Sequence, residues 1–147
     1  MINKLLSLIK KPSETQQRST EQTILLAAVT LLVEVAKADH NLSSEEELKL
    51  SELVSKNFGK GDQDVAELIS LAISNAKEAT SLYEFTSVIN KNYSELEKFQ
   101  LITNMWEIAY SDESIDKYEE HLIRKVADLI YLSHAKYIEA KHLANNT

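Results

Sequence analysis

Apolar residues along most of this chain recur every three or four positions, which is the period of an amphipathic α-helix. Only two Gly and one Pro interrupt the pattern, whereas good helix formers such as Ala, Leu, Glu and Lys are abundant. The pattern therefore predicts an all-α fold, a single-domain bundle of about seven helices. The expected helices lie near residues 20–38, 43–57, 63–76, 81–91, 94–110, 116–132 and 134–145.

The expected helix starts coincide with capping boxes. In this motif a Ser or Asp side chain accepts a hydrogen bond from a backbone amide in the first turn. A Glu or Gln side chain three residues later accepts a hydrogen bond from the backbone amide of that Ser or Asp. Gly59 is expected to end one helix in a left-handed conformation. The predicted boxes are Ser19/Gln22, Ser43/Glu46, Ser81/Glu84, Ser94/Glu97 and Asp116/Glu119.

Two segments of the chain share one pattern of apolar and acidic positions. They are EVAKADHNLSSEEELKL (34–50) and EIAYSDESIDKYEEHLI (107–123). In each, a helix ends near an Asp, a short turn follows, and a second helix begins, which predicts a duplicated helix-loop-helix hairpin. The matching pairs are Glu34/Glu107, Ala36/Ala109, Asp39/Asp112, Leu42/Ile115, Glu46/Glu119, Glu47/Glu120 and Leu50/Ile123.

The two turns carry side-chain oxygens at their first, third, fifth and eighth positions. Alternating oxygens followed by a helical Glu suit a hard divalent cation, because Ca²⁺ takes about six to eight oxygen ligands and Mg²⁺ about six. Both turns are shorter than an EF-hand loop. The candidate ligands of Ca²⁺ or Mg²⁺ are Asp39, Asn41, Ser43 and Glu46 in the first turn, and Asp112, Ser114, Asp116 and Glu119 in the second.

An interpretation without a metal ion also accounts for much of this spacing of side-chain oxygens. Capping boxes explain the last two oxygen positions of each turn with no cation. Asp39 and Asp112 are harder to explain, because a carboxylate at a helix C-terminus faces the negative end of the helix dipole. Either a cation or a hydrogen bond to a nearby backbone amide would compensate. Both interpretations stay open at this point.

If cations bind, we expect the second turn to be the stronger site. It offers the carboxylates of Asp112, Asp116 and Glu119, whereas two of the four ligands in the first turn are neutral. Negative potential near the second turn is increased by Glu107, Glu113 and Glu120. In the first turn, by contrast, His40 would oppose a cation when it is protonated.

Composition narrows the classes of function. A net charge of −7 without a continuous basic stretch argues against nucleic-acid binding. The chain has no Cys, hence no thiolate ligand or thiol nucleophile. Glu139 and His142 match half of a di-iron signature, but no second pair completes it. No serine has an identifiable His and carboxylate partner, so we predict a non-enzymatic protein.

The N-terminal residues 1–19 are expected to form a short amphipathic lead helix and a linker, with the main domain at 20–147. The run MINKLLSLIKKPSE lacks the apolar core and cleavage site of a signal peptide, so we expect a cytoplasmic protein. Residues 1–11 have an apolar stripe flanked by Lys, which suits a membrane surface. We favour folding back or pairing with another chain, because one short basic helix binds lipid weakly.

The repeated motif, an Asp after Ala or Ser followed by a small polar residue and a Glu, resembles the TerB-like tellurite-resistance family. That family also forms the N-terminal domain of the DjlA co-chaperones. The resemblance spans about residues 20–145 and is strongest in WEIAYSDESIDKYEEHLIRKVADLIYLSHAKYIEAK. It implies a helical domain with acidic, cation-binding turns and a link to tellurite or general stress responses.

The family's Asp and Glu positions correspond to Asp39, Glu46, Asp112 and Glu119. His40 and Glu113 stand where the family has Gly, which adopts positive φ more freely. Tellurium chemistry itself is not implied, since the chain has no thiol. A metal-free helical module for protein-protein interaction, as an adapter linked to chaperones or membranes, is the alternative.

Overall fold

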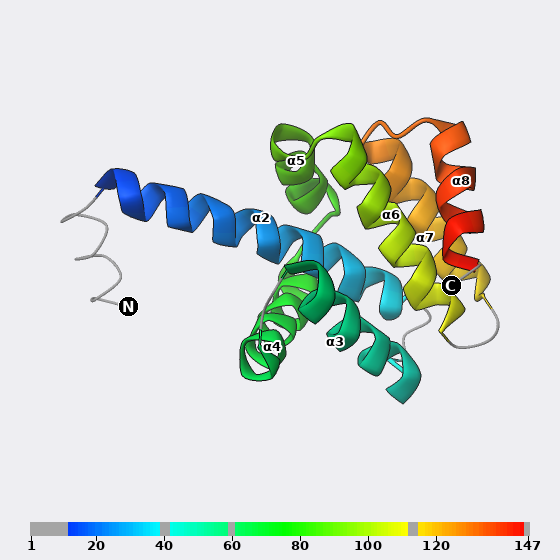
Figure 1. The fold of residues 1–147 in the computed structure, drawn as a ribbon, viewed down its shortest axis with the longest axis horizontal. Helices are drawn as coiled ribbons and strands as arrows, with labels where there is room; N and C mark the ends of the chain where they lie inside the picture. The colour runs from blue at the N-terminus through cyan, green and yellow to red at the C-terminus, as the bar shows by residue number, and fades with distance from the viewer. Residues whose placement is uncertain (1–11, 39–41, 59–60, 112–114, 146–147) are drawn as a thin grey trace.

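The computed structural model describes residues 12–38, 42–58, 61–111 and 115–145, and within these ranges all regular structure is helical (Figure 1). The fold class predicted from the apolar period is thus confirmed. The helices are α2 (Pro12–Ala36), α3 (Ser44–Phe58), α4 (Asp62–Glu78), α5 (Tyr83–Asn92), α6 (Glu95–Tyr110), α7 (Lys117–Leu129) and α8 (His134–Asn145).

The largest departure from the sequence prediction is the start of α2. The helix begins at Pro12, so residues 12–19 are its first turns rather than the expected linker. Pro is favoured at the first position of a helix, where its missing N–H has no partner to lose. The N-terminal part of α2 consequently extends away from the other helices (Figure 1). The lead segment 1–11 and Gly59 lie outside the described residues.

Three of the five predicted capping residues stand at helix starts. Ser43 and Ser94 form reciprocal boxes, and Asp116 is the N-cap of α7. Ser19 lies inside α2, and α5 starts after Leu82, so the boxes predicted at Ser19 and Ser81 are wrong. Glu84 instead accepts from the Thr80 amide at 3.4 Å. A capping signal alone does not mark a start when an adjoining segment continues the helix.

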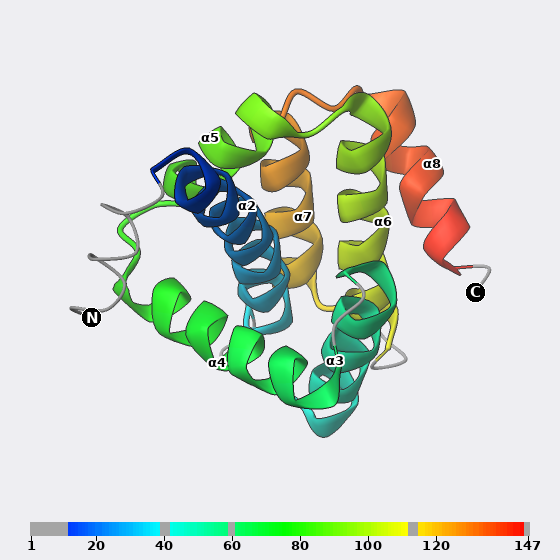
Figure 2. The same ribbon diagram turned by 60° about the vertical axis from the view of Figure 1, so that its left-hand side comes forward.

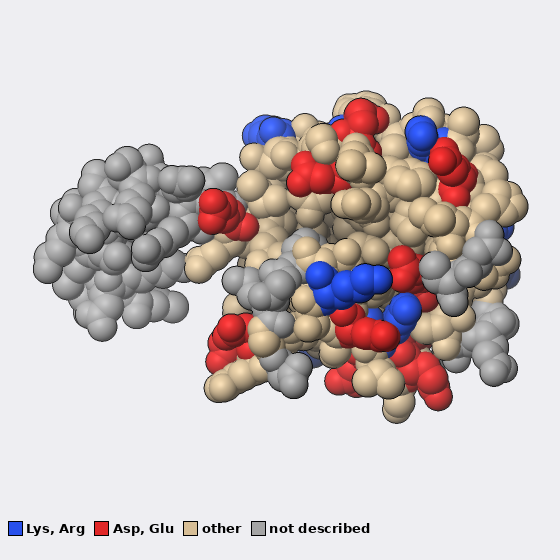
Figure 3. All heavy atoms as spheres, in the orientation of Figure 1, with Lys and Arg blue, Asp and Glu red and all other residues tan. Residues whose placement is uncertain are grey.

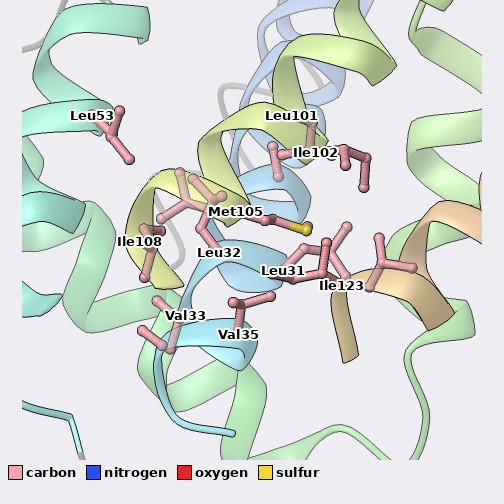
Figure 4. Packing of buried hydrophobic residues seen from close by; sticks show 14 of the residues in the cluster. Leu31, Leu32, Val33, Val35, Leu53, Leu101, Ile102, Met105, Ile108 and Ile123 are labelled. Atoms are coloured by element: carbon pink, nitrogen blue, oxygen red, sulfur yellow. The ribbon is translucent and has the colours of Figure 1, made fainter. Parts of the chain in front are cut away.

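The core forms between α2, which lies in the middle of the molecule in Figure 2, and α6, which packs on it. Around them, α4 and α5 pack on α2, α8 packs on α6, and α3 and α7 contact both. Figure 4 shows side chains of α2, α6 and α7 meeting there, with Met105 among them. The labelled side chains are Leu31, Leu32, Val33, Val35, Leu53, Leu101, Ile102, Met105, Ile108 and Ile123, all buried.

The two segments with matching sequence are both helix-turn-helix units, α2 with α3 and α6 with α7. Matched residues have the same degree of burial. The alanines at 36 and 109, and the pair Leu50 and Ile123, are fully buried, whereas Glu47 and Glu120 are exposed. This agreement supports the hypothesis of a duplicated hairpin, which remains a sequence-based prediction.

The end of α7 holds a non-glycine residue with positive φ. Tyr131 has φ 61° and follows the C-cap residue Ile130. The amide of Tyr131 donates to the Asp128 carbonyl at 3.1 Å, and the Leu132 amide donates to the Ala127 carbonyl at 2.9 Å. These two bonds define a Schellman motif, in which Gly usually occupies the left-handed position. The Tyr131 side chain is 78% exposed and contributes little packing.

Tyr131→Gly is therefore expected to stabilise the protein by about 0.5–1 kcal/mol, because Gly adopts the left-handed conformation without steric cost. The midpoint of urea unfolding should rise without a change in slope. Tyr131→Ala serves as the control, since it removes the ring but keeps the Cβ. An equal gain in both variants would assign the effect to the ring rather than to backbone strain.

Candidate cation-binding turns

The structure describes only part of each predicted cation-binding turn. Four of the predicted ligands lie outside the described residues, namely Asp39, Asn41, Asp112 and Ser114. The structure therefore does not test the predicted ligand sets. Ser43, Glu46, Asp116 and Glu119 are described, and all four lie at the N-terminal ends of α3 and α7. These ends belong to different helix-turn-helix units.

The first turn ends in a complete capping box. The Ser43 amide donates to Glu46 Oε1 at 3.2 Å, and the Glu46 amide donates to Ser43 Oγ at 3.1 Å. This geometry fixes the Glu46 carboxylate against the first turn of α3, where the positive end of the helix dipole favours an anion. The capping role predicted for these two residues is confirmed.

The second turn is capped differently. Asp116 has an extended backbone, and its carboxylate accepts from the Tyr118 amide at 2.7 Å rather than from the amide of Glu119. The Asp116 side chain thus uses one oxygen as an N-cap and keeps its second oxygen for other contacts. Glu119 occupies the same helical position in α7 that Glu46 occupies in α3, three residues after the cap.

Burial of these two glutamates is the feature that the sequence patterns missed. Glu46 and Glu119 are each only 1% exposed, a rare state for a carboxylate. One oxygen of Glu46, Oε2, is buried and has no hydrogen-bond partner within the described part of the chain. Their neighbours in the repeat gave a signal, because each Glu lies four residues before a buried apolar residue, Leu50 or Ile123, and so faces inward.

Lysines offset part of the negative charge expected near the second turn. Lys49 Nζ on α3 lies 3.8 Å from the Glu107 carboxylate on α6, and Lys141 Nζ on α8 lies 3.5 Å from Glu120. A preference for the second turn would therefore rest on its own carboxylates rather than on Glu107 and Glu120. Figure 3 shows acidic and basic side chains interspersed on the face in view.

Glu34, which matches Glu107 in the repeat, has a different electrostatic setting. Burial raises the pKa of its half-buried carboxyl above the ordinary value of 4.5, and the charge of Lys37 opposes this shift only in part. A raised pKa means that folding favours the protonated form. This contribution to stability is present below pH 4.5 and is lost as the pH rises through the pKa of the folded state.

Glu34→Gln should consequently raise the melting temperature at pH 7, and the gain should shrink as the pH falls towards 4. Partial solvent exposure limits the gain to about 2 °C. The matched control is Glu107→Gln, which breaks the ion pair with Lys49 and should lower the melting temperature at pH 7. Differential scanning calorimetry at both pH values, with chelator present, measures this. A gain that persists unchanged at pH 4 would refute the assignment.

Among the described residues, no three His, Cys, Asp or Glu side chains are grouped as a metal site would need. Because half of the expected ligands lie outside those residues, this result leaves the predicted sites untested. In the same part of the chain, none of the helices has the length and apolar character required to cross a lipid bilayer.

Comparison with known proteins identifies one family. The profile of the family described as tellurite resistance protein TerB matches residues 25–142, a region that runs from α2 to α8 and includes both turns. Searches among curated proteins and among solved structures gave no significant match. Because the family match covers most of the chain, the protein belongs to the TerB family.

Proposed function

We propose that this chain is a non-catalytic, cytoplasmic TerB domain that binds Ca²⁺ or Mg²⁺ at the turns 39–46 and 112–119 as part of a tellurite or stress response. Membership of the TerB family supports the link to tellurite resistance. The observation that carries the cation proposal is the buried Oε2 atom of Glu46, which has no hydrogen-bond partner among the residues that the structure describes.

A buried carboxylate oxygen without a partner is costly, because the charge has left water and gained nothing in exchange. A divalent cation held by Glu46, with the oxygens of Asp39, Asn41 and Ser43, would remove that cost. Glu119 is buried at the equivalent position of the second hairpin. With Asp112, Ser114 and Asp116 it supplies a second set of oxygen ligands.

The alternative function is a metal-free module for protein-protein interaction. It is favoured by the capping bonds of Ser43, Glu46 and Asp116, which give these side chains a structural role without any cation. In that case the exposed helical faces would contact the partner, and removing divalent cations would leave the fold and its stability unchanged.

A thermal-shift titration separates the two functions. Chelator-treated protein should gain stability when Ca²⁺ or Mg²⁺ is added, by about 2.7 kcal/mol at a concentration one hundred times the dissociation constant. The double variant Asp39→Ala/Asp112→Ala should lose this gain. The control Asp64→Ala/Asp128→Ala removes two exposed carboxylates elsewhere and should retain it. No shift at millimolar cation would reject the cation proposal.

The single variants rank the two turns. We expect Asp112→Ala to remove the tighter phase of an amide-resolved Ca²⁺ titration and Asp39→Ala to remove the weaker one, because the second turn offers more carboxylates. The reverse result would show that ligand charge does not decide the affinity. The ion pairs that lysines form with Glu107 and Glu120, and Glu113 in place of the family's Gly, would then have the larger effect on cation binding.

A further inference from the structure

Helix α8 lies on the outer side of α6, at the edge of the bundle (Figure 2). The buried residues of α8 are Tyr137, Ala140 and Ala144. The Tyr137 ring lies 5.4 Å from the ring of Trp106 on α6. Among the described helices, α6 is the one against which α8 packs most closely. One interface, with α6, therefore holds most of α8 in place.

The connection between α7 and α8 lacks the residues that usually end a helix. It consists of Ile130, Tyr131, Leu132 and Ser133, without Gly or Pro, and we name it the α7–α8 turn. Tyr131 has the left-handed conformation there, with φ 61°, which is unfavourable for a residue with a Cβ. We infer that the packing of α8 imposes this turn, because the local sequence does not favour it.

A continuous helix is the alternative conformation of this segment. In the turn, the Tyr131 amide donates to the Asp128 carbonyl and the Leu132 amide donates to the Ala127 carbonyl. In a continuous α-helix the same two amides would donate to the same two carbonyls in exchanged order, because each amide bonds to the carbonyl four residues earlier. Tyr131 would then have a negative φ. Straightening therefore costs no hydrogen bond of these two amides and releases the strain of Tyr131.

Straightening the turn separates α8 from α6 of its own chain. It uncovers Trp106 and Tyr137, which are 0% and 5% exposed in the packed form, and such apolar surface must be covered again. A second copy of this chain carries an α8 with the same buried face, which therefore fits the same surface of α6. Exchange of α8 also restores the ion pair between Lys141 Nζ and the Glu120 carboxylate, which are 3.5 Å apart.

We propose that two copies of this chain exchange α8, with the α7–α8 turn straightened and α8 of each copy packed on α6 of the other. Exchange of an identical element is a low-cost route to a dimer, because monomer and dimer share one interface. On the turn itself, release of the Tyr131 strain favours the dimer, and loss of the contacts of the buried Leu132 opposes it.

Concentration then decides the balance between the two forms. A short connection gives closure within one chain an effective concentration of about 1 mM, so we expect monomer at about 10 µM and substantial dimer at about 1 mM. The exchange does not involve the proposed cation-binding turns, and chelator should leave it unchanged.

The ion pair between α7 and α8 provides the test. Glu120→Lys and Lys141→Glu each place like charges between these helices, in the monomer and in an exchanged homodimer alike. A mixed dimer with one copy of each variant restores two pairs of opposite charge. The variants, one of them ¹⁵N-labelled, are equilibrated together at about 1 mM and measured by native mass spectrometry. The ratio of mixed dimer to homodimers should exceed the statistical value at least about threefold.

The control uses an ion pair that exchange would keep within one chain. Lys136 Nζ and the Glu139 carboxylate are 3.1 Å apart on α8 itself, so a mixture of Lys136→Glu and Glu139→Lys should give the statistical ratio. Absence of dimer in the mixture of Glu120→Lys and Lys141→Glu would overturn the proposal. A statistical ratio in that mixture, or an equal excess in the control mixture, would show association through another surface and overturn it as well.

Two substitutions test the turn. Tyr131→Gly relaxes the left-handed position of the monomer and disfavours the straightened helix, so the dimer should form at least about tenfold less readily. Tyr131→Ala keeps the Cβ and its strain, and should dimerise within about twofold of the parent. Sedimentation equilibrium of both variants and the parent gives the three dissociation constants. Equal dimerisation of the Gly and Ala variants would overturn the proposal.

Discussion

Trp106→Ala is expected to destabilise the protein by about 3–5 kcal/mol, the usual cost of removing a fully buried aromatic side chain. The Trp106 side chain is 0% exposed and lies in the C-terminal half of α6. Its ring lies 5.4 Å from the ring of Tyr137 on α8 and 6.1 Å from that of Tyr110. Lys141 Nζ lies 5.1 Å from the ring centre on the α8 side. The substitution thus removes the contacts of Trp106 with Tyr137 and Lys141, which are part of the packing of α8 on α6.

Trp106→Phe tests which part of the side chain matters. The buried indole Nε1 of Trp106 has no hydrogen-bond partner in the described ranges, so replacing it with carbon recovers a desolvation cost of about 1–3 kcal/mol. Loss of ring volume acts against this gain, and the net effect should be much smaller than that of Trp106→Ala. Urea unfolding, followed by circular dichroism, compares both with Leu96→Ala, a change at a side chain 65% exposed. A loss of stability in Leu96→Ala as large as that in Trp106→Ala would contradict this explanation.

The position of Trp106 was predictable because helical burial leaves a periodic signal. Ile102, Met105, Trp106 and Ala109 fall on one face of an amphipathic segment, and all four are buried. The same periodicity placed five of the helices within two residues of their observed ends, since both their apolar faces and their boundaries depend on local sequence. Fold class therefore followed from period and composition alone.

The start of α2 was not predictable in the same way. Residues 12–19 are polar and begin with Pro, and such a segment has no apolar face that separates a helix from a linker. Here the helix is continuous from Pro12 into the buried part of α2. Extending an existing helix costs less than nucleating a new one, so local propensity underestimates its length.

The candidate site was predictable in its residue types but not in its surroundings. Spacing in the sequence indicated Ser43 and Glu46 as a box, yet only the packing of α3 shows that Glu46 Oε2 has no hydrogen-bond partner among the described residues. The ion pairs of Glu107 and Glu120 join helices that are distant in sequence.

Glu46→Gln is expected to have opposite effects with and without a divalent cation. In chelator, the variant should be as stable as the parent or more stable, because Gln keeps the capping bond through Oε1 and removes a buried negative charge. With saturating Ca²⁺ the parent gains stability by binding at the folded state, and the variant loses a charged ligand of the first turn. The difference should then reverse and reach about 1–3 kcal/mol in favour of the parent.

The chain contains its own control for this experiment. Ser94 and Glu97 form the same reciprocal box at the start of α6, with bonds of 2.8 and 3.2 Å, but no predicted cation-binding turn precedes it. Glu97→Gln should therefore change stability by the same amount in chelator and in Ca²⁺. Urea unfolding measures the free energy of unfolding of the parent and of both variants, in chelator and in Ca²⁺. It thus gives the difference between each variant and the parent under each condition. If Glu46→Gln is as insensitive to Ca²⁺ as Glu97→Gln, the first turn is a helix cap and not a cation site.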